Sequence, residues 1–458
     1  MSIVNAMLIN NEKKEPWFTK KQILILAVFL ILAFFSNMYV GSSGFLAFGI
    51  MLAYILFTNT SNCLPMIYFL IPMLRILDST GVTVLVNIII YVIAIKWIIT
   101  KRRINGRLFL FCLFLFAFEI PHAFLTIDYR TYNLASELIG DCQMALNMYC
   151  ALDIFTSTVA ADDRYKTFCR HLIAGVIASA VLNISVVGVG RLSSMLTNTL
   201  YRFIAFANDP NYYSMYILLG IIYLLSVLTR ETLNIKEFVV LFFLMCIGLL
   251  TQSKMFLLCL IGIIIYVTIV NATSVKRLWK IMFSMLVVFA VASLVFPDFT
   301  ITFLHKTVDR FTQYGGNTLG SITTGRSTIA IEYLELLFKN PLELMFGYGI
   351  GYPNLTFGVV SHNTYLDILL SYGVIGSIVM VGFLVLFLKD SLCSFELKHR
   401  FLSLLCFMIT IVALSCLTAD MFYYLFILAL LPLHKQKEYP IYVKQMPELK
   451  SLSPMVSR

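Results

Sequence analysis

Three arginines and one histidine are the residues of this chain best suited to carry out chemistry. Arg310, Arg326 and His362 fall in or next to the long polar stretch 297–363, and Arg202 precedes a polar turn at 208–211. Arginine forks match the oxygens of phosphate groups, and an imidazole with a pKa of about 6.5 can act as a base at neutral pH. These side chains predict chemistry on an anionic substrate.

The rest of the chain must position these residues within a membrane. Hydrophobic residues make up 60% of the 458 residues and charged residues only 13%, which is typical of a polytopic membrane protein. Apolar runs long enough to cross a hydrocarbon core of about 30 Å recur from residue 23 to residue 433. The alternating pattern of a barrel is missing from the sequence, so the spans are expected to be helices.

We predict an all-α polytopic membrane protein with about 14 transmembrane helices. The expected spans are 23–39, 44–58, 63–77, 82–99, 108–127, 137–156, 172–190, 211–228, 236–250, 255–271, 279–296, 364–388, 401–417 and 419–433. This gives a cytoplasmic tail (1–22), helices 1–11 (23–296), an extracytoplasmic catalytic loop (297–363), helices 12–14 (364–433) and a second cytoplasmic tail (434–458).

The distribution of positive charge predicts the orientation in the membrane. The formal net charge is +10, and with both termini in the cytoplasm about 25 of the 34 basic residues fall on the cytoplasmic side, as the positive-inside rule requires. This charge faces anionic lipid and does not indicate nucleic-acid binding. The basic residues left outside are Arg75, Arg130, Arg191, Arg202, Lys254, Lys306, Arg310, Arg326 and Lys339. Several of them are predicted to line an outer cationic site.

Two short outer segments are candidate anion sites. Asp209 and Asn211 belong to an Asn-Asp-Pro-Asn turn that predicts the start of a helix, whose free backbone N–H groups can bind a phosphate near Arg202. The connection 251–254 is very short and ends in Lys254, which either reaches the membrane interface or contacts the same phosphate.

The long outer loop has three recognisable parts. A stretch rich in Gly, Thr and Ser at 315–325 predicts a mobile lid. The spacing of apolar residues over Ser327–Lys339 predicts a short amphipathic helix on the membrane surface, stopped by Asn340-Pro341. The Gly-rich turn at 347–351 predicts tight backbone packing.

His362 follows this loop at the head of the twelfth span, and Ser361 and Asn363 are placed to orient it. The carboxylates Asp209, Asp298, Asp309 and Asp367 are scattered along the sequence. We therefore expect no metal site and no cofactor.

Three stretches in the same order resemble the O-antigen polymerase and O-antigen ligase superfamily, which contains Wzy-type polymerases and their ligase relatives. They are Arg202 with the 208–211 turn; Thr324-Gly325-Arg326 continuing through 340–351; and Ser361-His362-Asn363 continuing to 376. Each motif alone is weak, whereas the ordered set with the long outer loop is fairly specific. The resemblance covers about residues 200–390.

The resemblance implies a GT-C-like fold and transfer of a glycan from an undecaprenyl-pyrophosphate carrier at the outer face of the bacterial cytoplasmic membrane. It implies that Arg202 and Arg326 hold the pyrophosphate and that His362 acts on the acceptor hydroxyl. Lys254 stands where the family often has arginine, and lysine cannot form the bidentate clamp. The expected partners are lipid-linked oligosaccharides as donor and acceptor, membrane lipid, a chain-length regulator and a flippase.

The expected function is polymerisation of lipid-linked repeat units into a surface polysaccharide such as O-antigen or capsule. His362 would remove the proton of a sugar hydroxyl, giving inversion in a single displacement, and Arg191, Lys254 and Arg310 would add positive charge around the pyrophosphate. Two alternatives remain: a ligase that passes finished glycan to another acceptor, and a flippase for lipid-linked oligosaccharides. A flippase should show internal repeats, which are not evident in the sequence.

Overall fold

The computed structural model describes residues 17–101, 105–114, 134–157, 161–188, 190, 202–230, 235–270, 297–312, 326–349, 361–389, 392, 401–414 and 421–433, with isolated positions between 279 and 294. Within helices, only the backbone is described at 134–141, 161–162, 227–230, 267–270, 298–300, 303, 307 and 310–312. All regular elements in these ranges are helices. Their bounds are α2 (Lys20–Met38), α3 (Ser43–Phe57), α4 (Thr60–Leu70), η2 (Ile71–Met73), η3 (Asp78–Thr80), α5 (Leu85–Lys101), α7 (Leu134–Thr156), α8 (Ala161–Val187), α10 (Pro210–Arg230), α11 (Ile235–Leu250), α12 (Lys254–Val270), α14 (Pro297–Thr312), α16 (Arg326–Lys339), α17 (Pro341–Phe346), α19 (Thr364–Leu388), α20 (Leu402–Thr410), η5 (Ile411–Ala413), α21 (Phe422–Leu430) and η6 (Leu431–Leu433).

Several helices are apolar enough to cross a membrane. Three have the length and composition for it, namely α2, residues Asp163–Val187 of α8, and α19, and four shorter apolar helices accompany them. Large apolar side chains point outward on these elements; Leu24 is 65% exposed and Leu46 is 62% exposed. Outward apolar faces are unfavourable in water and favourable in lipid. These are the features of a helical membrane protein.

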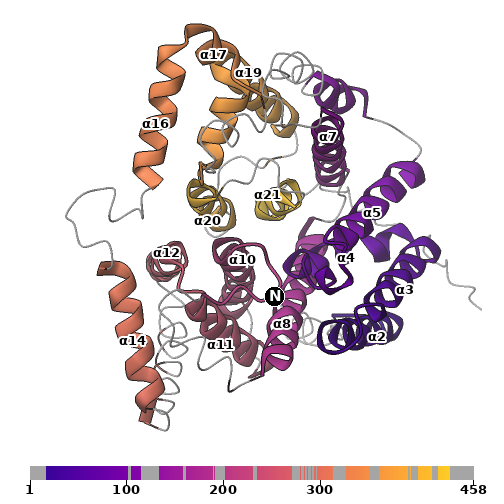
Figure 1. Ribbon diagram of the computed structural model, residues 1–458, viewed down its shortest axis with the longest axis vertical. Coiled ribbons are helices and arrows are strands. Elements are labelled where there is room, and N and C mark those ends of the chain that lie inside the picture. The colour runs from indigo at the N-terminus through magenta and orange to yellow at the C-terminus, as the bar shows by residue number, and fades with distance from the viewer. Residues whose placement is uncertain are drawn as a thin grey trace, which may run out of the picture.

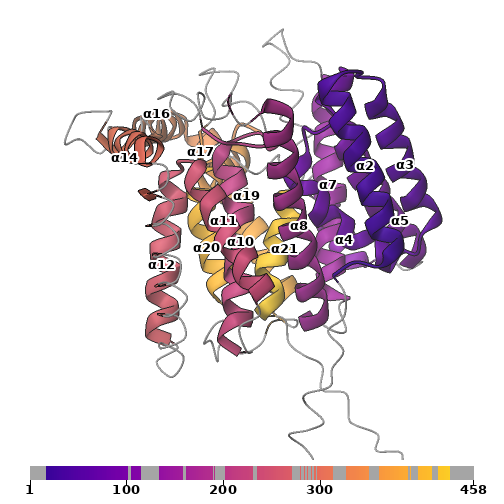
Figure 2. The same ribbon diagram turned by 90° about the horizontal axis from the view of Figure 1, so that it is seen from below.

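Most of the helices run side by side as a bundle, seen end-on in Figure 1. The helices α2, α3, α4 and α5 form one side, while α8, α10, α11, α20 and α21 form the centre (Figures 1 and 2). Buried apolar residues from both groups make one continuous core. Close approach of α8 to α4 depends on Gly175, where a Cβ atom would lie 2.2 Å from the carbonyl oxygen of Phe69.

The predicted third span, 63–77, is not one continuous helix. It consists of α4, the short η2 and a series of turns, because Pro72 cannot supply the N–H that would continue the helix. The carbonyl of Pro72 instead accepts a hydrogen bond from Ser179 Oγ on α8 at 2.9 Å. Beyond this break, Arg75 N donates to the carbonyl of Phe206 at 3.1 Å, which ties the third span to the segment before α10.

Three helices lie across one end of the bundle instead of running along it. They are α14, α16 and α17, and Figure 2 shows α14 and α16 lying crosswise at the edge of the bundle, near the upper end of α12. The amphipathic helix predicted at Ser327–Lys339 is present as α16, and it ends before Asn340-Pro341 as expected. Residues 297–312, which the sequence analysis included in the outer loop, form the helix α14. We call this the α14–α16 end.

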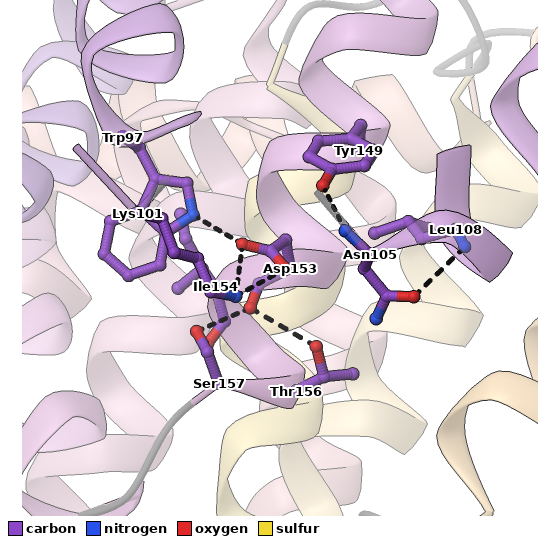
Figure 3. Close-up of polar contacts among 9 residues, drawn as sticks. All are labelled: Trp97, Lys101, Asn105, Leu108, Tyr149, Asp153, Ile154, Thr156 and Ser157. Carbon is purple, nitrogen blue, oxygen red and sulfur yellow. Dashed lines mark hydrogen bonds and ion pairs between the residues drawn. The ribbon is translucent and has the colours of Figure 1, made fainter. Parts of the chain in front are cut away.

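A buried ion pair lies near the C-terminal ends of α5 and α7, at the end of the bundle opposite the α14–α16 end. Figure 3 shows its contacts. Lys101 Nζ of α5 lies 2.6 and 2.7 Å from the two carboxylate oxygens of Asp153 on α7. Trp97 Nε1 donates to the same carboxylate at 2.9 Å. The Asp153 side chain is only 2% exposed, so its charge depends on these two partners. The pair joins α5 to α7 at this end.

A glycine junction joins the outer segment to α19. Gly373 has a non-helical backbone (φ 62°) that kinks α19, and Gly347 packs against it with φ 83°. A Cβ atom on Gly373 would lie 2.5 Å from Gly347 N, and one on Gly347 would lie 2.3 Å from the carbonyl oxygen of Ser371. The tight backbone packing predicted for the Gly-rich turn is therefore confirmed at Gly347, in the described part of the turn.

Candidate functional site

Four connecting segments that are far apart in the sequence meet at the α14–α16 end. They are residues 202–211 before α10, residues 251–253 between α11 and α12, the first turn of α16, and residues 361–363 before α19. Phe203 N donates to the carbonyl of Leu250 at 3.2 Å, which joins the first two segments. The charges of Arg326 and Asp209 both act on the pKa of His362, so the first turn of α16 and the 202–211 segment lie within electrostatic range of the 361–363 segment.

The guanidinium of Arg202 is held in place by the first two segments. Its Nε donates to the carbonyl of Thr251 at 3.2 Å, and its Nη2 donates to Asn211 Oδ1 at 3.0 Å. These bonds fix both the position and the plane of the fork. A pre-oriented guanidinium loses less freedom when it binds an anion than a mobile one does.

Asn211 is the centre of this hydrogen-bond network. Its side chain is 6% exposed, and its Oδ1 also accepts a hydrogen bond from Ser253 Oγ at 2.8 Å. Its backbone N–H donates to Asp209 Oδ1 at 2.7 Å, which forms the Asx turn that starts α10. The predicted helix start at Pro210 is confirmed. One amide thus links α10, the 251–253 corner and Arg202.

The 251–253 corner is buried, not merely a short surface connection. Thr251 and Ser253 are 0% and 1% exposed. Thr251 Oγ1 donates to the carbonyl of Gly248 at 2.6 Å and lies 2.9 Å from Ser214 Oγ, while Ser253 Oγ accepts from the backbone N–H of Phe256 at 3.2 Å. Ser253 therefore caps α12, whose first residue is the half-buried Lys254.

The corner that carries His362 is built by its neighbours. Asn363 caps α19, because its Oδ1 accepts from the backbone N–H groups of Tyr365 at 3.0 Å and Leu366 at 3.3 Å. Ser361 Oγ donates to a carboxylate oxygen of Asp367 and accepts from Asn363 N at 3.0 Å. Both side chains were expected to orient the imidazole, and their hydrogen bonds fix the backbone on either side of it.

The electrostatic surroundings of His362 favour the neutral imidazole. Burial of the half-exposed ring lowers its pKa below the ordinary value, and the positive charge of Arg326 lowers the pKa further. The carboxylate of Asp209 acts in the opposite direction and raises the pKa. The net result is a lowered pKa, so His362 is deprotonated at neutral pH and can accept a proton.

Backbone strain is concentrated at the same place. Among the described residues, three that are not glycine have a positive φ: Ala205 (48°), Gln252 (48°) and His362 (53°). Each belongs to a different one of the converging segments. Such conformations cost about 1–3 kcal/mol each and collect at functional sites, where the surrounding structure enforces them. This coincidence supports a functional role for the corner residues.

The structure brings most of the predicted site residues together. Arg202, Asp209 and Asn211 share one network, His362 lies within electrostatic range of Arg326 and Asp209, and Lys254 begins the helix next to Ser253. Asn363 serves as a helix cap. Arg191 lies outside the described residues, as does the 315–325 stretch, and of Arg310 only the backbone, in α14, is described.

Three participants were missed by the sequence analysis. Thr251 and Ser253 support Arg202 and Asn211, and their signal was the Thr-x-Ser pattern directly before an apolar run, which is typical of a helix cap. The third is Asp367, whose carboxylate accepts a hydrogen bond from Ser361 Oγ. Asp209, a predicted site residue, acts on the pKa of His362.

The site therefore combines positive charge with a neutral imidazole on a rigid frame. Such an arrangement can bind an anionic group and accept a proton beside it. In the part of the chain that the structure describes, no three His, Cys, Asp or Glu side chains are grouped to hold a metal ion. Comparison with protein-family models and with curated proteins gave no match to this chain.

Proposed function

We propose that this protein is a polysaccharide polymerase that joins undecaprenyl-pyrophosphate-linked repeat units. One observation carries the proposal: His362 is kept neutral at a corner where the charge of Arg326 acts on it, beside the network that fixes Arg202. The order of these motifs along the chain resembles Wzy-type polymerases. The proposed reaction needs both parts, an anion clamp and a base.

The arginines would hold the pyrophosphate of the donor lipid. Negative charge builds up on this group as the glycosidic bond breaks, so a fixed cation beside it stabilises the transition state more than the ground state. Arg202 is fixed by Thr251 and Asn211, and Arg326 stands at the start of α16. Lys254 would add a point charge without a bidentate fork.

His362 would act as the general base. An acceptor sugar hydroxyl gives its proton to the imidazole while its oxygen forms a bond to the anomeric carbon of the donor. The bond from that carbon to the pyrophosphate oxygen breaks, and its electron pair leaves with undecaprenyl pyrophosphate. One displacement inverts the configuration at the anomeric carbon.

We further propose that the α14–α16 end faces the outside of the cytoplasmic membrane and that the full chain has about 14 spans in a GT-C-like arrangement. Lys101, Lys96 and Arg164 lie toward the opposite end, as the positive-inside rule expects of a cytoplasmic face. Nucleotide sugars are not supplied outside the cell. A lipid-linked donor, already activated by its pyrophosphate, fits that side.

The test replaces His362 with asparagine, which tolerates a positive φ better than other side chains and cannot act as the base. Purified protein in liposomes receives lipid-linked repeat units extracted from the source cells, and glycan ladders are read on a gel. His362→Asn should lower the rate by about 10²- to 10⁴-fold while lipid binding persists. His305→Asn, at an exposed position of α14, is the matched control and should keep the ladder.

Each other outcome has a defined meaning. An intact ladder in His362→Asn would show that the histidine is structural and would remove the proposed base. Wild-type protein that makes no ladder but passes glycan to a different acceptor would be a ligase. Movement of lipid-linked glycan between leaflets without any new bond would identify a flippase.

A further inference from the structure

In the 251–253 corner, Gln252 differs from its neighbours because its side-chain amide makes no hydrogen bond to the described residues. Its side chain is 5% exposed, and its backbone has a positive φ of 48°. Neither Oε1 nor Nε2 has a hydrogen-bond partner among the residues that the structure describes. A buried carboxamide without partners is unfavourable, so such a group calls for a reason.

The neighbours of Gln252 make the contrast clear. Thr251 and Ser253 are equally buried, and each bonds to the framework through its hydroxyl. The backbone of Gln252 is also strained, because it holds a left-handed conformation that glycine, but not glutamine, adopts at little cost. Within the described part of the chain, the corner thus keeps a strained residue whose amide donor and acceptor have no hydrogen-bond partner.

The position of Gln252 relative to Arg202 suggests what the amide is for. The carbonyl of Thr251, one residue before Gln252, accepts the hydrogen bond from Arg202 Nε at 3.2 Å. If Arg202 holds the pyrophosphate, the next group along the donor is the sugar attached to it. That sugar carries neutral groups that donate and accept hydrogen bonds, which are the partners that a carboxamide lacks.

We propose that Gln252 is a specificity-determining residue that binds the pyrophosphate-linked sugar of the donor. The inference rests on the proposed function and adds a substrate contact to it. The carboxamide offers one acceptor oxygen and an NH₂ group with two donor hydrogens. Two adjacent sugar hydroxyls, or an acetamido group, supply the donor and the acceptor that complement it. A neutral amide contributes little to holding the pyrophosphate itself, which is left to the arginines.

This role predicts opposite effects on binding and on stability. In the protein without ligand, Gln252→Met removes two polar atoms that have no hydrogen-bond partner among the described residues, and it keeps an unbranched side chain of similar length. The apparent melting temperature should therefore rise. Affinity for the sugar-bearing lipid should fall, because the amide contacts are lost. A purely structural glutamine would lose stability and leave sugar preference unchanged.

Gln22 provides the matched control. It is also buried, at 6% exposure, but its amide is paired: Oε1 accepts from Thr19 N at 2.9 Å and Nε2 donates to the carbonyl of Asn62 at 3.4 Å. Gln22→Met should lower the melting temperature and leave lipid binding as in the wild type.

The experiment measures equilibrium binding to the purified full chain in lipid nanodiscs with two probes. One is undecaprenyl pyrophosphate without sugar, and the other is the lipid-linked repeat unit extracted from source cells. Wild type should bind the second probe about tenfold more tightly. Gln252→Met should bind both probes equally, and Arg202→Ala should weaken both.

The failures can be told apart. If Gln252→Met leaves the sugar preference intact, or weakens both probes alike, Gln252 does not contact the sugar and the inference is overturned while the proposed function stands. If the wild type binds neither probe, the proposed function is wrong, and the inference about Gln252 is wrong as well. A lower melting temperature for Gln252→Met would also contradict the inference, because it would mean that the amide serves the fold.

Discussion

At the scale of single residues, His362 sits between two opposite charges. Burial and the guanidinium of Arg326 disfavour the imidazolium, whereas the carboxylate of Asp209 favours it. The lowering effects prevail, and the pKa ends below its ordinary value of about 6.5. The imidazole is therefore neutral at neutral pH, as the proposed role of general base requires, and its protonation on acidification should abolish the proposed activity.

Replacing either charge should move the pKa of His362 in a known direction. Arg326→Gln removes a repulsion from the imidazolium, so the pKa should rise. Asp209→Asn removes an attraction, so the pKa should fall further. The measurement is an NMR titration of histidine-labelled protein, with the His362 signal assigned by its loss in His362→Asn.

The pH dependence of activity should shift in the same direction as the pKa of His362. The acid limb of kcat/KM should lie below pH 6.5 in the wild type, shift to higher pH in Arg326→Gln and shift to lower pH in Asp209→Asn. Shifts in the same direction for both variants would mean that the two charges do not act directly on His362.

The residue types of the site were largely readable from the sequence. Arginine, histidine and the Asn-Asp-Pro-Asn turn have chemical signatures that do not depend on the fold. The hydrogen bonds between these residues could not be predicted from the sequence. That Asn211 would accept from both Arg202 and Ser253 depends on how α10 and α12 pack, and no spacing along the chain encodes it. The αL backbone of His362 and Gln252 was likewise hidden, since neither is a glycine.

At the scale of elements, the position of His362 depends on α19 and the helix that packs on it. The backbone N–H of Tyr348 donates to the carbonyl of Leu370 at 2.7 Å, and that of Gly349 donates to the carbonyl of Ser371 at 3.0 Å. These bonds satisfy carbonyls that the kink at Gly373 leaves without helical partners. The outer segment and α19 therefore hold each other in place.

Gly373→Ala should break this junction. The added Cβ atom meets backbone atoms of Gly347 and Met345 at 2.5 Å, and the φ of 62° is unfavourable for alanine. We expect a loss of about 3 kcal/mol in the free energy of unfolding. A shift of about 1 Å at His362 would cost about 10²-fold in kcat/KM. Thermal unfolding and the ladder assay check both.

Gly382→Ala is the control on the same helix. A Cβ atom there has no neighbour within 4 Å, so stability should be equal or slightly higher, because alanine favours the helix. Equal effects of the two substitutions would show that the kink is not a close-packed junction.

Helix positions were predicted better than helix breaks. The starts of α10 and α16 were close to their expected residues because proline, asparagine and apolar spacing are local signals. The break after α4 and the kink in α19 were missed, since their apolar composition is the same on both sides. The helix α14 was included in the loop because its charged residues suggested an exposed connection.

At the scale of the whole molecule, the two ends of the bundle have separate tasks. The α14–α16 end holds the candidate site, and the opposite end holds the Lys101–Asp153 pair (Figure 3). Between them lies the apolar core of the described helices. A change at the opposite end should therefore alter stability without altering the site.

Lys101→Met should demonstrate this separation. Among the described residues, it leaves the buried carboxylate of Asp153 with only Trp97 as a partner. Losing one partner of a buried pair typically costs about 3–5 kcal/mol, and we expect about 3 kcal/mol here because Lys101 is 29% exposed. The pKa of His362 should not move. Thermal unfolding and the histidine titration measure the two effects.

The double variant Lys101→Met with Asp153→Asn should recover part of the loss, because no buried charge remains. Lys20→Met, at an exposed position of α2, should be close to neutral. A lowered melting temperature in Lys20→Met equal to that in Lys101→Met would mean that the ion pair is not the cause.

The separation of the site along the chain has a consequence for biosynthesis. Arg202, Asn211 and Ser253 all emerge before α14 is made, whereas His362 follows about 110 residues later, or roughly 5 to 20 seconds of translation. The part of the site around Arg202 can therefore assemble during translation, before His362 has been synthesised. On the proposed function, a nascent chain passes through a stage in which it can bind the anionic lipid donor without reacting with it, and ribosome-stalled chains ending before residue 362 should capture that stage.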